Sequence, residues 1–496
     1  MRASGILMHI TSLPGDYGVG TMGQQAYSFI DFLKRAGQRY WQILPLNPTG
    51  YGDSPYQSCS AFAGNPYLVD LSALQEEGLL LPEEVEKIQW SETADRVDFG
   101  RLYENRGNVL HIAFSRFSDD AALDTFCREN DWWLSDFALY MALKEANGGK
   151  AWYQWEVPLM RRLKGALAAA RSDLAQEIRY HCFVQYLFYR QWSQLRRYAK
   201  EKGIAFIGDV PIYVPYDSAD VWSHPELFCL DDQLQPEAVA GCPPDAFSQD
   251  GQLWGNPLYN WDRLKEDRYG WWVQRIEAAA KRYDVVRIDH FRGLESYWAV
   301  PYGEKTARNG RWLPGPGMDL ICAICEVLPK AELIAEDLGF LTPQVLQFRE
   351  ESGFPGMKVL QFAFGGGYDS DYLPHRHIEN SVCYTGTHDN MTMAQWFASA
   401  DASAVAHAIQ YMRLSQEEGY VWGAIRTAMA SVSKLCIIPM QDYLNLGAQA
   451  RMNFPGTQTA ANWTWRADEG FACDALADKI YQMTKLFARL GADSES

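Results

Sequence analysis

Short apolar runs bounded by turn residues recur along the chain and predict eight β-strands. The predicted strands are residues 4–9, 40–45, 204–210, 284–290, 332–337, 357–363, 381–387 and 434–440. Runs rich in β-branched and aliphatic residues are typical of parallel strands that are buried on both faces. The last four runs are separated by amphipathic stretches, at intervals near the roughly 30 residues of a strand-helix unit. The pattern therefore predicts an α/β fold, a closed (β/α)8 TIM barrel.

Two long intervals between these strands predict insertions into the barrel. Residues 70–200, after the second strand, show helical spacing of apolar residues and predict an inserted helical subdomain. Residues 211–270 form a second predicted insertion. We therefore expect a single domain over residues 1–496, with largely helical insertions. The residues after 445 are too few and too helix-like for a C-terminal β-sandwich, and their end predicts a closing helix.

Three of the predicted strands end in or near a carboxylate, and these acids are the most informative feature of the chain. Asp289, Glu336 and Asp389 each follow a short apolar run. Neighbouring parallel strands can direct such side chains to one point, and a buried carboxylate is costly unless it is paired or used. Three converging acids indicate chemistry that needs an acid, a base and a nucleophile, as glycoside cleavage does.

The neighbours of the three acids suggest different roles. Alternation along the strand places Arg287 on the same face as Asp289, where its charge would help to keep a nucleophilic carboxylate ionised. A structural ion pair explains that spacing equally well. Glu336 follows Leu-Ile-Ala, an apolar setting that would raise its pKa and suit a general acid. Asp389, beside His388, offers hydrogen bonds to sugar hydroxyls, although any one of the acids could instead cap a helix.

The composition narrows the class of partner. The chain has 45 basic and 62 acidic residues, and its net charge of −17 disfavours nucleic acids and anionic membranes. A neutral substrate fits better, and 18 Trp, 27 Tyr and 23 Phe provide rings that can stack on sugars as well as fill a core. Ten irregularly spaced cysteines resemble reduced thiols. With no signal-peptide pattern and no apolar run of about 20 residues, the sequence predicts a cytoplasmic protein.

Neither a cofactor nor a metal ion is expected from the motifs. Residues 18–23 match GxGxxG, but a Pro-Gly turn separates them from the preceding strand, and residue 43 is Ile where a dinucleotide-binding unit has an acid. The histidines near the predicted strand ends and in 375–377 lack metal-binding spacing. The sequence predicts no metal site.

Ten motifs over nearly the whole chain resemble those of the amylomaltases, the 4-α-glucanotransferases of the α-amylase clan. They are residues 5–15, 41–46, 54–56, 208–214, 241–245, 251–259, 286–292, 335–339, 385–390 and 438–442. The resemblance implies a catalytic barrel in which Asp289 is the nucleophile, Glu336 the acid/base and Asp389 the stabilising acid. It also implies transfer of an α-1,4-glucan segment to the 4-hydroxyl of glucose or a maltooligosaccharide.

The resemblance further implies a loop, residues 241–256, that covers the active site. The substrate-binding residues that it implies are Tyr56, Asp209, Asp245, Trp254, Asn256, Arg287, His290, Asp337 and His388. The family does not imply calcium. A retaining hydrolase would use the same acids, and a silent glucan-binding protein would keep the aromatic residues, so both stay as alternatives. The sequence leaves the choice between a monomer and a homo-oligomer open.

Overall fold

A computed structural model describes residues 2–50, 52–244, 248–339 and 341–491 of the chain, and within them the eight predicted strands form one parallel sheet. Its strands are β1 (Ala3–Leu7), β2 (Tyr40–Gln42), β3 (Ala205–Val210), β6 (Val285–Ile288), β9 (Glu332–Ala335), β10 (Gly356–Val359), β11 (Ser381–Tyr384) and β12 (Leu435–Pro439). Their order is β10-β11-β12-β1-β2-β3-β6-β9. The predicted barrel strands are confirmed, but most end earlier than expected. After β10, for example, the chain enters a 3-10 helix, Leu360–Ala363.

The two outermost strands of that order, β9 and β10, meet at a seam with few backbone contacts. The backbone N–H of Ala335 donates to the carbonyl of Pro355 over 3.0 Å. The backbone N–H of Met357 donates to a side chain, the Asp337 carboxylate, over 2.6 Å. A carboxylate thus takes the place that a carbonyl would have in a regular ladder, and it helps to close the barrel.

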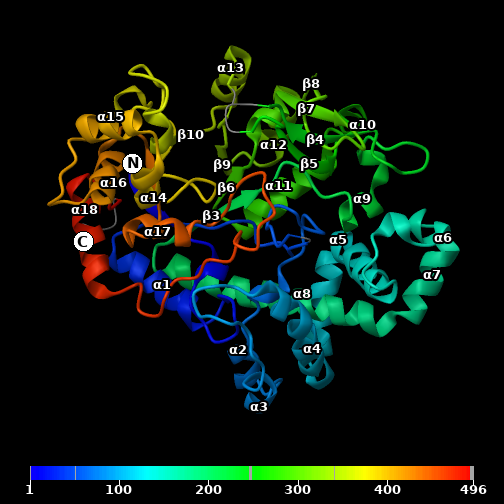
Figure 1. Cartoon of the computed structure of the whole chain (residues 1–496). Helices are drawn as coiled ribbons and strands as arrows, with labels where there is room; N and C mark the ends of the chain where they lie inside the picture. Colours follow the sequence, from blue (N-terminus) through cyan, green and yellow to red (C-terminus); the bar gives the residue numbers. More distant parts are fainter. Residues whose placement is uncertain (1, 51, 245–247, 340, 492–496) are drawn as a thin grey trace.

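Helices cover the outside of the barrel (Figure 1). They are α1 (Gln24–Arg35), α8 (Ala175–Glu201), α11 (Gly270–Arg282), α12 (Met318–Val327), α13 (Pro343–Ser352), α14 (Met393–Ser399), α15 (Ala402–Met412), α16 (Tyr420–Ala430) and α18 (Asp474–Leu486). Helix α1 shows why they pack there: its buried residues include Phe29, whose ring lies 4.8 Å from that of Trp41 on β2. Helix α18 is the predicted closing helix. Just after it, Arg489 donates to the carbonyl of Ala3, which links this end of the chain to the start of β1.

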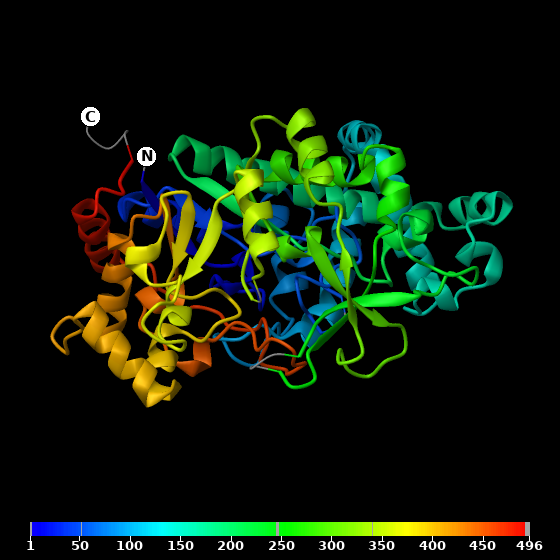
Figure 2. The same ribbon diagram turned by 90° about the horizontal axis from the view of Figure 1, so that it is seen from above.

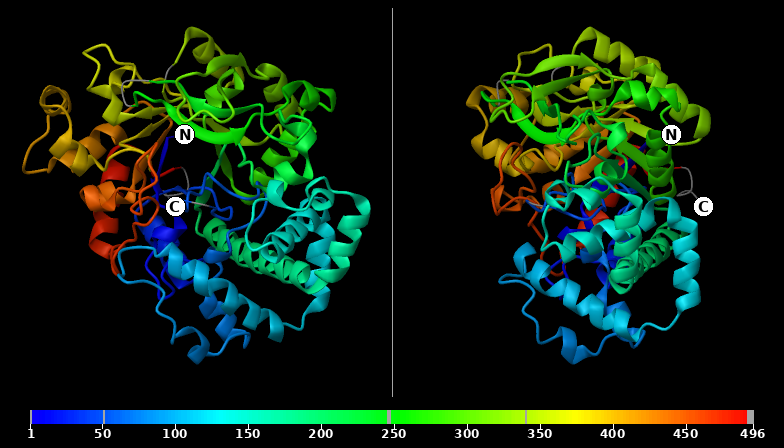
Figure 3. Two further views of the ribbon diagram at one scale, coloured as in Figure 1. Left: turned by 45° about the vertical axis from the view of Figure 1, so that its right-hand side comes forward. Right: turned by 90° about the vertical axis from the view of Figure 1, so that its right-hand side faces the viewer.

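Residues 71–201 are built from helices that stand to one side of the barrel, opposite α15 and α16 (Figures 1 and 3). Besides α8 they are α2 (Leu71–Glu76), α3 (Pro82–Val85), α4 (Phe99–Arg116), α5 (Asp120–Ala146), α6 (Val157–Met160) and α7 (Lys164–Asp173). Helix α8 also belongs to the barrel wall. The Trp192 indole on this helix donates to the carbonyl of Arg282 over 3.1 Å and packs on Phe206 of β3. The insertion and the barrel therefore share a helix, and a separate subdomain stays a prediction.

The expectation of largely helical insertions is wrong for residues 211–270. This segment has two short helices, α9 (Ala219–Ser223) and α10 (Trp261–Glu266), and two strands, β4 (Ala238–Cys242) and β5 (Gln252–Pro257). The strands join β7 (Ser296–Pro301) and β8 (Arg311–Pro314) in an antiparallel sheet of order β5-β4-β7-β8. Figure 2 shows this sheet in green beside the barrel. The hairpin is stable because strands from a later loop pair with it, a long-range contact that its own sequence does not reveal.

The segment between β12 and α18 also differs from the sequence prediction. After a short helix, α17 (Met440–Tyr443), it contains one further 3-10 turn, Ala448–Ala450, and is otherwise irregular in the described residues. The helix-like pattern predicted for this segment is therefore wrong up to residue 473. The structure assigns no sheet strand to residues 440–491, in keeping with the expected lack of a C-terminal β-sandwich. In the described ranges, no helix combines the length and the apolar character that a bilayer crossing requires.

Candidate active site

The three predicted acids lie at the carboxyl-end rim of the barrel. The ladder continues just past the strands: the N–H of Asp289 donates to Val210 O, and that of Glu336 to Ile288 O, both over 3.0 Å. Asp389 stands in the loop after β11. Arg287 bonds both Asp289 and Asp209, and the N–H of His290, next to Asp289, holds the Glu336 carboxyl. Next to Asp389, His388 stacks on Tyr56, whose hydroxyl donates to the same Asp209. The structure therefore brings the predicted acids together at one rim.

Arg287 ties two of the rim carboxylates together from inside the barrel. Its Nη1 atom lies 2.7 and 2.6 Å from the two oxygens of Asp209 and 3.0 Å from Oδ1 of Asp289. The Asp209 side chain is 0% exposed and that of Arg287 4%. Burial lowers the pKa of Arg287, but Asp209 and Asp289 outweigh burial and raise it well above its ordinary value. The guanidinium is therefore a permanent positive charge beside Asp289.

The Asp289 carboxyl is the more accessible member of this group, with 28% of its side chain exposed. Burial raises its pKa, the charge of Arg287 opposes that rise, and the neighbouring acids Asp209 and Glu336 add to it. The ion pair expected from the sequence is present, but it offsets the effect of burial and does not abolish it. Burial and the neighbouring acids together outweigh Arg287, so the pKa of Asp289 lies well above its ordinary value.

Both oxygens of the Glu336 carboxyl are held by backbone groups. Oε2 accepts from the N–H of His290 over 2.8 Å, and Oε1 from the N–H of Leu338 over 2.9 Å. The residue is 7% exposed, and burial raises its pKa to about 7, although Arg287 and the two N–H groups oppose the rise. The raised pKa predicted from the sequence is confirmed. A carboxyl with this pKa can release and recover a proton near neutral pH.

His290 connects the acid pair to the antiparallel sheet. Its backbone is left-handed, with φ 49° and ψ 44°, a conformation that non-glycine residues adopt rarely. Its ring makes an edge contact with Trp254 on β5, with 4.8 Å between ring centroids. Burial lowers the pKa of His290 to about 3, so the ring is neutral. Strand β5 therefore reaches the residue whose N–H holds Glu336.

The third acid, Asp389, is positioned by the irregular segment that precedes α18. Its Oδ1 atom accepts from the Asn453 side chain over 2.6 Å, and its carbonyl accepts from Arg451 over 3.0 Å. The ring of His388 lies 3.5 Å from its Oδ2. Nearly half of the Asp389 side chain is exposed, 45%. Asn453 and Arg451 were not foreseen, because they lie in a segment without strand or helix periodicity.

Rings form one wall of the site. Tyr56 stacks on His388, with centroids 5.2 Å apart and planes at 16°. The hydroxyl of Tyr56 donates to Asp209 over 2.7 Å. Trp463, a further residue that the sequence did not indicate, packs near both rings, at 5.8 and 5.9 Å. The ring of Tyr56 is therefore held by stacking on one face and by the hydrogen bond of its hydroxyl group.

Several residues expected to bind substrate have other contacts in the structure. Asp209 is enclosed by Arg287 and Tyr56, and this placement favours a positioning role over contact with a sugar hydroxyl. Asp337 faces the seam of the barrel, 3.6 Å from Arg349.

Asn256, at the end of β5, is buried and accepts a hydrogen bond from the Gln57 side chain over 3.2 Å. The predicted cover loop, residues 241–256, overlaps the end of β4 and most of β5. Asp245, which was expected to contact substrate from that loop, lies outside the described residues.

A parallel barrel with two rim carboxyls held by an arginine and by backbone N–H groups, and a third acid nearby, defines a carbohydrate-active enzyme of the glycosidase type. Comparison with known proteins narrows this class. The sequence profile described as 4-alpha-glucanotransferase, glycoside hydrolase family 77, matches residues 8–471. The chain belongs to this family.

Individual relatives agree with the family assignment along their full length. A 4-alpha-glucanotransferase of Clostridium butyricum is 48% identical, with 97% of this chain and 100% of the relative aligned. One of Thermus thermophilus is also 48% identical, with 99% of each chain aligned. The solved amylomaltase of Streptococcus agalactiae, in complex with acarbose, is 44% identical, has a TM-score of 0.96 and covers 99% of this chain and 100% of its own. The fold and the family expected from the motifs are confirmed.

Proposed function

We propose that this enzyme transfers a segment of an α-1,4-glucan to the 4-hydroxyl of glucose or a maltooligosaccharide, and that Asp289 and Glu336 perform both half-reactions. The observation that carries the assignment is the unequal environment of these two carboxyls. One pairs with Arg287, and the other is buried and held by two backbone N–H groups. Two interacting acids with one proton between them divide naturally into a nucleophile and an acid.

In the first half-reaction Asp289 attacks the anomeric carbon of the donor sugar. The bond from that carbon to the glycosidic oxygen breaks, and Glu336 gives its proton to the departing oxygen. The products are a glucosyl ester on Asp289, an ionised Glu336 and a shortened glucan with a free 4-hydroxyl. Arg287, 3.0 Å from Asp289, favours the ionised nucleophile at the start of this step.

In the second half-reaction an acceptor sugar takes the place of the departed glucan. The Glu336 carboxylate removes the proton from the acceptor 4-hydroxyl, whose oxygen attacks the anomeric carbon and releases Asp289. Two displacements at one carbon retain its configuration. The pKa of about 7 lets Glu336 act as an acid in one step and as a base in the next.

Asp389 serves in this proposal as the stabilising acid, and Asn453 fixes its orientation. Its partly exposed carboxylate can accept hydroxyl groups of a sugar that is distorted toward an oxocarbenium ion. Asp209 acts through Arg287, because its side chain has no exposed surface. Asp337 acts through the barrel seam next to Glu336.

The remaining predicted residues are proposed to bind glucan at the rim. Tyr56 and Trp254 supply ring surfaces, and His290 and His388 supply neutral ring nitrogens. Sugar stacking and hydroxyl bonding are the contacts that these groups make with carbohydrates. Asp245 and Asn256 remain predicted glucan contacts. A cytoplasmic location likewise remains a prediction of the sequence.

Hydrolysis is the competing function, since water can replace the acceptor in the second step. The family and its named relatives are glucanotransferases, and this favours transfer. A glucan-binding protein without catalytic activity is disfavoured, because all three acids are present and lie together.

Incubation with maltotriose alone tests transfer. We expect glucose and a ladder of longer maltooligosaccharides, with a constant number of reducing ends. Reducing ends that rise while only shorter sugars form would identify a hydrolase. The Asp289→Asn variant, as a matched control, should bind maltotriose and form neither product set.

A further inference from the structure

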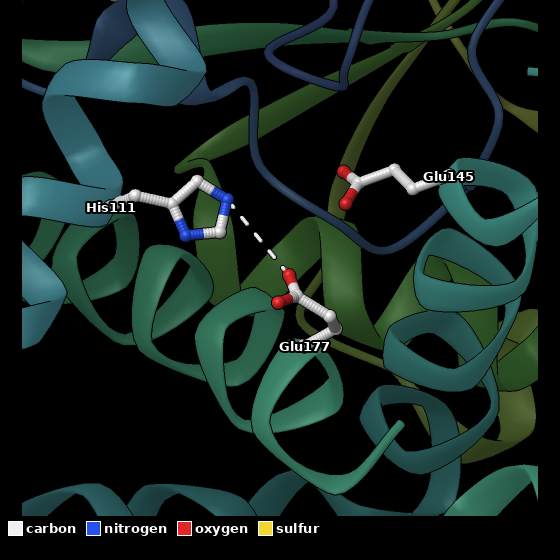
Figure 4. Close-up of side chains that lie close together, drawn as sticks. All are labelled: His111, Glu145 and Glu177. Carbon is white, nitrogen blue, oxygen red and sulfur yellow. Dashed lines mark ion pairs between the residues drawn. The ribbon is translucent and has the colours of Figure 1, made fainter. Parts of the chain in front are cut away.

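A group of histidine and glutamate side chains lies far from the rim chemistry, among the helices of the 71–201 segment. His111 stands on α4, Glu145 on α5, and Glu177 and His181 on α8 (Figure 4 shows the first three). Glu177 and His181 are four positions apart, so they project from the same face of α8. Three helices thus direct imidazole and carboxylate groups toward one place.

The spacing of these groups is close to that of metal ligands. Nε2 of His111 lies 3.9 Å from Oε2 of Glu177, and Nε2 of His181 lies 3.2 Å from Oε1 of Glu145. One ligand atom from each of His111, Glu145 and Glu177 lies within 4.8 Å of the other two. Around a tetrahedral zinc ion, donors about 2.1 Å from the metal lie roughly 3.4 Å from one another. Movements of about 1 Å would bring the atoms of His111, Glu145 and Glu177 to that spacing, and Nε2 of His181 already lies that close to Glu145.

His181 supplies independent evidence for a ligand. The residue is only 7% exposed, and within the described part of the chain its Nε2 atom makes no hydrogen bond of good geometry, although Oε1 of Glu145 lies 3.2 Å away. A buried polar atom without a hydrogen bond is costly, and such atoms are rare in folded proteins. The atom points to the carboxylate of Glu145, where a bound cation would satisfy both groups.

The other three side chains leave the group open to solvent. The exposed fractions are 42% for His111, 48% for Glu145 and 44% for Glu177. An ion can therefore enter, and the glutamates have the freedom to close around it. The His111 ring is already held, because it stacks on Tyr180 with centroids 3.5 Å apart.

We propose that His111, Glu145, Glu177 and His181 bind a divalent transition-metal ion of the zinc class. Two neutral imidazoles and two carboxylates form a donor set that suits zinc, and the ion neutralises the two negative charges. The role of the site is structural: the ion ties α4, α5 and α8 together in the segment beside the barrel. No sequence motif indicates this site, because its ligands come from three helices and lack a zinc-binding spacing.

Zinc titration of the full chain tests the site, provided that competing thiols are removed. Cys322 and Cys325 on α12 and Cys473 before α18 are exposed, so all three are changed to Ser in every protein compared. Tag-free, metal-stripped protein is titrated with Zn²⁺ by calorimetry and with Co²⁺ by visible absorption. We expect one equivalent to bind and the thermal transition to rise with bound Zn²⁺.

The decisive variants are His111→Ala and Glu177→Gln, both at partly exposed positions that tolerate change. Each should weaken Zn²⁺ binding by more than about 100-fold. Loss of a residue that only supports a metal ligand costs at most about that factor, so a larger effect identifies a direct ligand. His224→Ala is the matched control, because His224 also lies near a glutamate, 3.6 Å from Glu226, on the surface. It should bind like the parent protein.

Two results would overturn the proposal. One is a parent protein that binds no Zn²⁺ at millimolar concentration. The other is unchanged binding by His111→Ala and Glu177→Gln. Circular dichroism and maltotriose transfer check that each variant is folded. If a single variant fails to fold, the other still decides, because the two ligands lie on different helices.

Discussion

Replacing Glu336 by Gln measures the free energy that the fold derives from the protonated carboxyl of this residue. Glu336 is 7% exposed, and burial raises its pKa from the ordinary value of 4.5 to about 7. Each unit of pKa corresponds to about 1.4 kcal/mol. The protonated form therefore contributes about 3 kcal/mol to the free energy of unfolding where it is fully populated.

The sign of the pH dependence follows from the raised pKa. The contribution is complete below pH 4.5, where the carboxyl is protonated in both the folded and the unfolded chain, and it is lost as the pH rises through about 7. Glutamine has no proton to lose. It also gives up one of the two acceptors for the N–H groups of His290 and Leu338, but that cost is the same at every pH. Relative to the variant, the wild type should lose about 3 kcal/mol between pH 4.5 and about pH 8.

Urea unfolding of both proteins across this pH range measures the difference directly. All other titrating groups are common to the two proteins, so the difference in unfolding free energy reports Glu336 and its effect on Asp289. Glu417→Gln, the same substitution at an exposed position, is the matched control with which the Glu336→Gln difference is compared. A difference between Glu336→Gln and wild type that stays constant with pH would refute the assigned pKa and the acid/base role that rests on it.

Three further predictions test the rim. Asp209→Asn leaves the buried charge of Arg287 without a full partner, and urea unfolding should show a loss of about 3–5 kcal/mol; an unchanged midpoint would contradict the buried pair. Asn453→Ala removes the 2.6 Å hydrogen bond to the half-exposed Asp389 and should lower kcat/KM for maltotriose about 10-fold. Circular dichroism should show an unchanged fold, and full activity would show that Asn453 does not position Asp389. The kcat/KM profile of the wild type should fall above about pH 7 as Glu336 loses its proton, and activity that is flat to pH 9 would exclude it as the acid.

The barrel was predictable because its signal is local. Each buried parallel strand is an apolar run, and the runs that lead to Asp289 and Glu336 end where the strands reach the rim. The predicted strands extend too far at their carboxyl ends. At β10, for example, the chain turns into a 3-10 helix while its residues are still apolar. The antiparallel sheet was missed because its pairing joins segments from two different loops.

The active site was predictable where side chains follow the strands and unpredictable where they come from irregular segments. Alternation placed Arg287 beside Asp289 correctly. Alternation also implies that the side chains of Asp337 and Glu336 point in opposite directions. The Asp337 carboxylate indeed lies at the seam between β9 and β10. Asn453 gave no signal, because its role depends on the path of a long loop and on no periodic pattern.

Trapping the covalent intermediate tests the central claim, that Asp289 is the nucleophile of a double displacement. Wild-type enzyme is incubated with a 5-fluoroglucosyl fluoride, whose slow second step allows the glucosyl-enzyme to accumulate, and is then digested for peptide mass spectrometry. The account predicts one fluoroglucosyl group, on the peptide that contains Asp289, and none in the Asp289→Asn variant. A label on another carboxylate, or a label that persists in the variant, would contradict it.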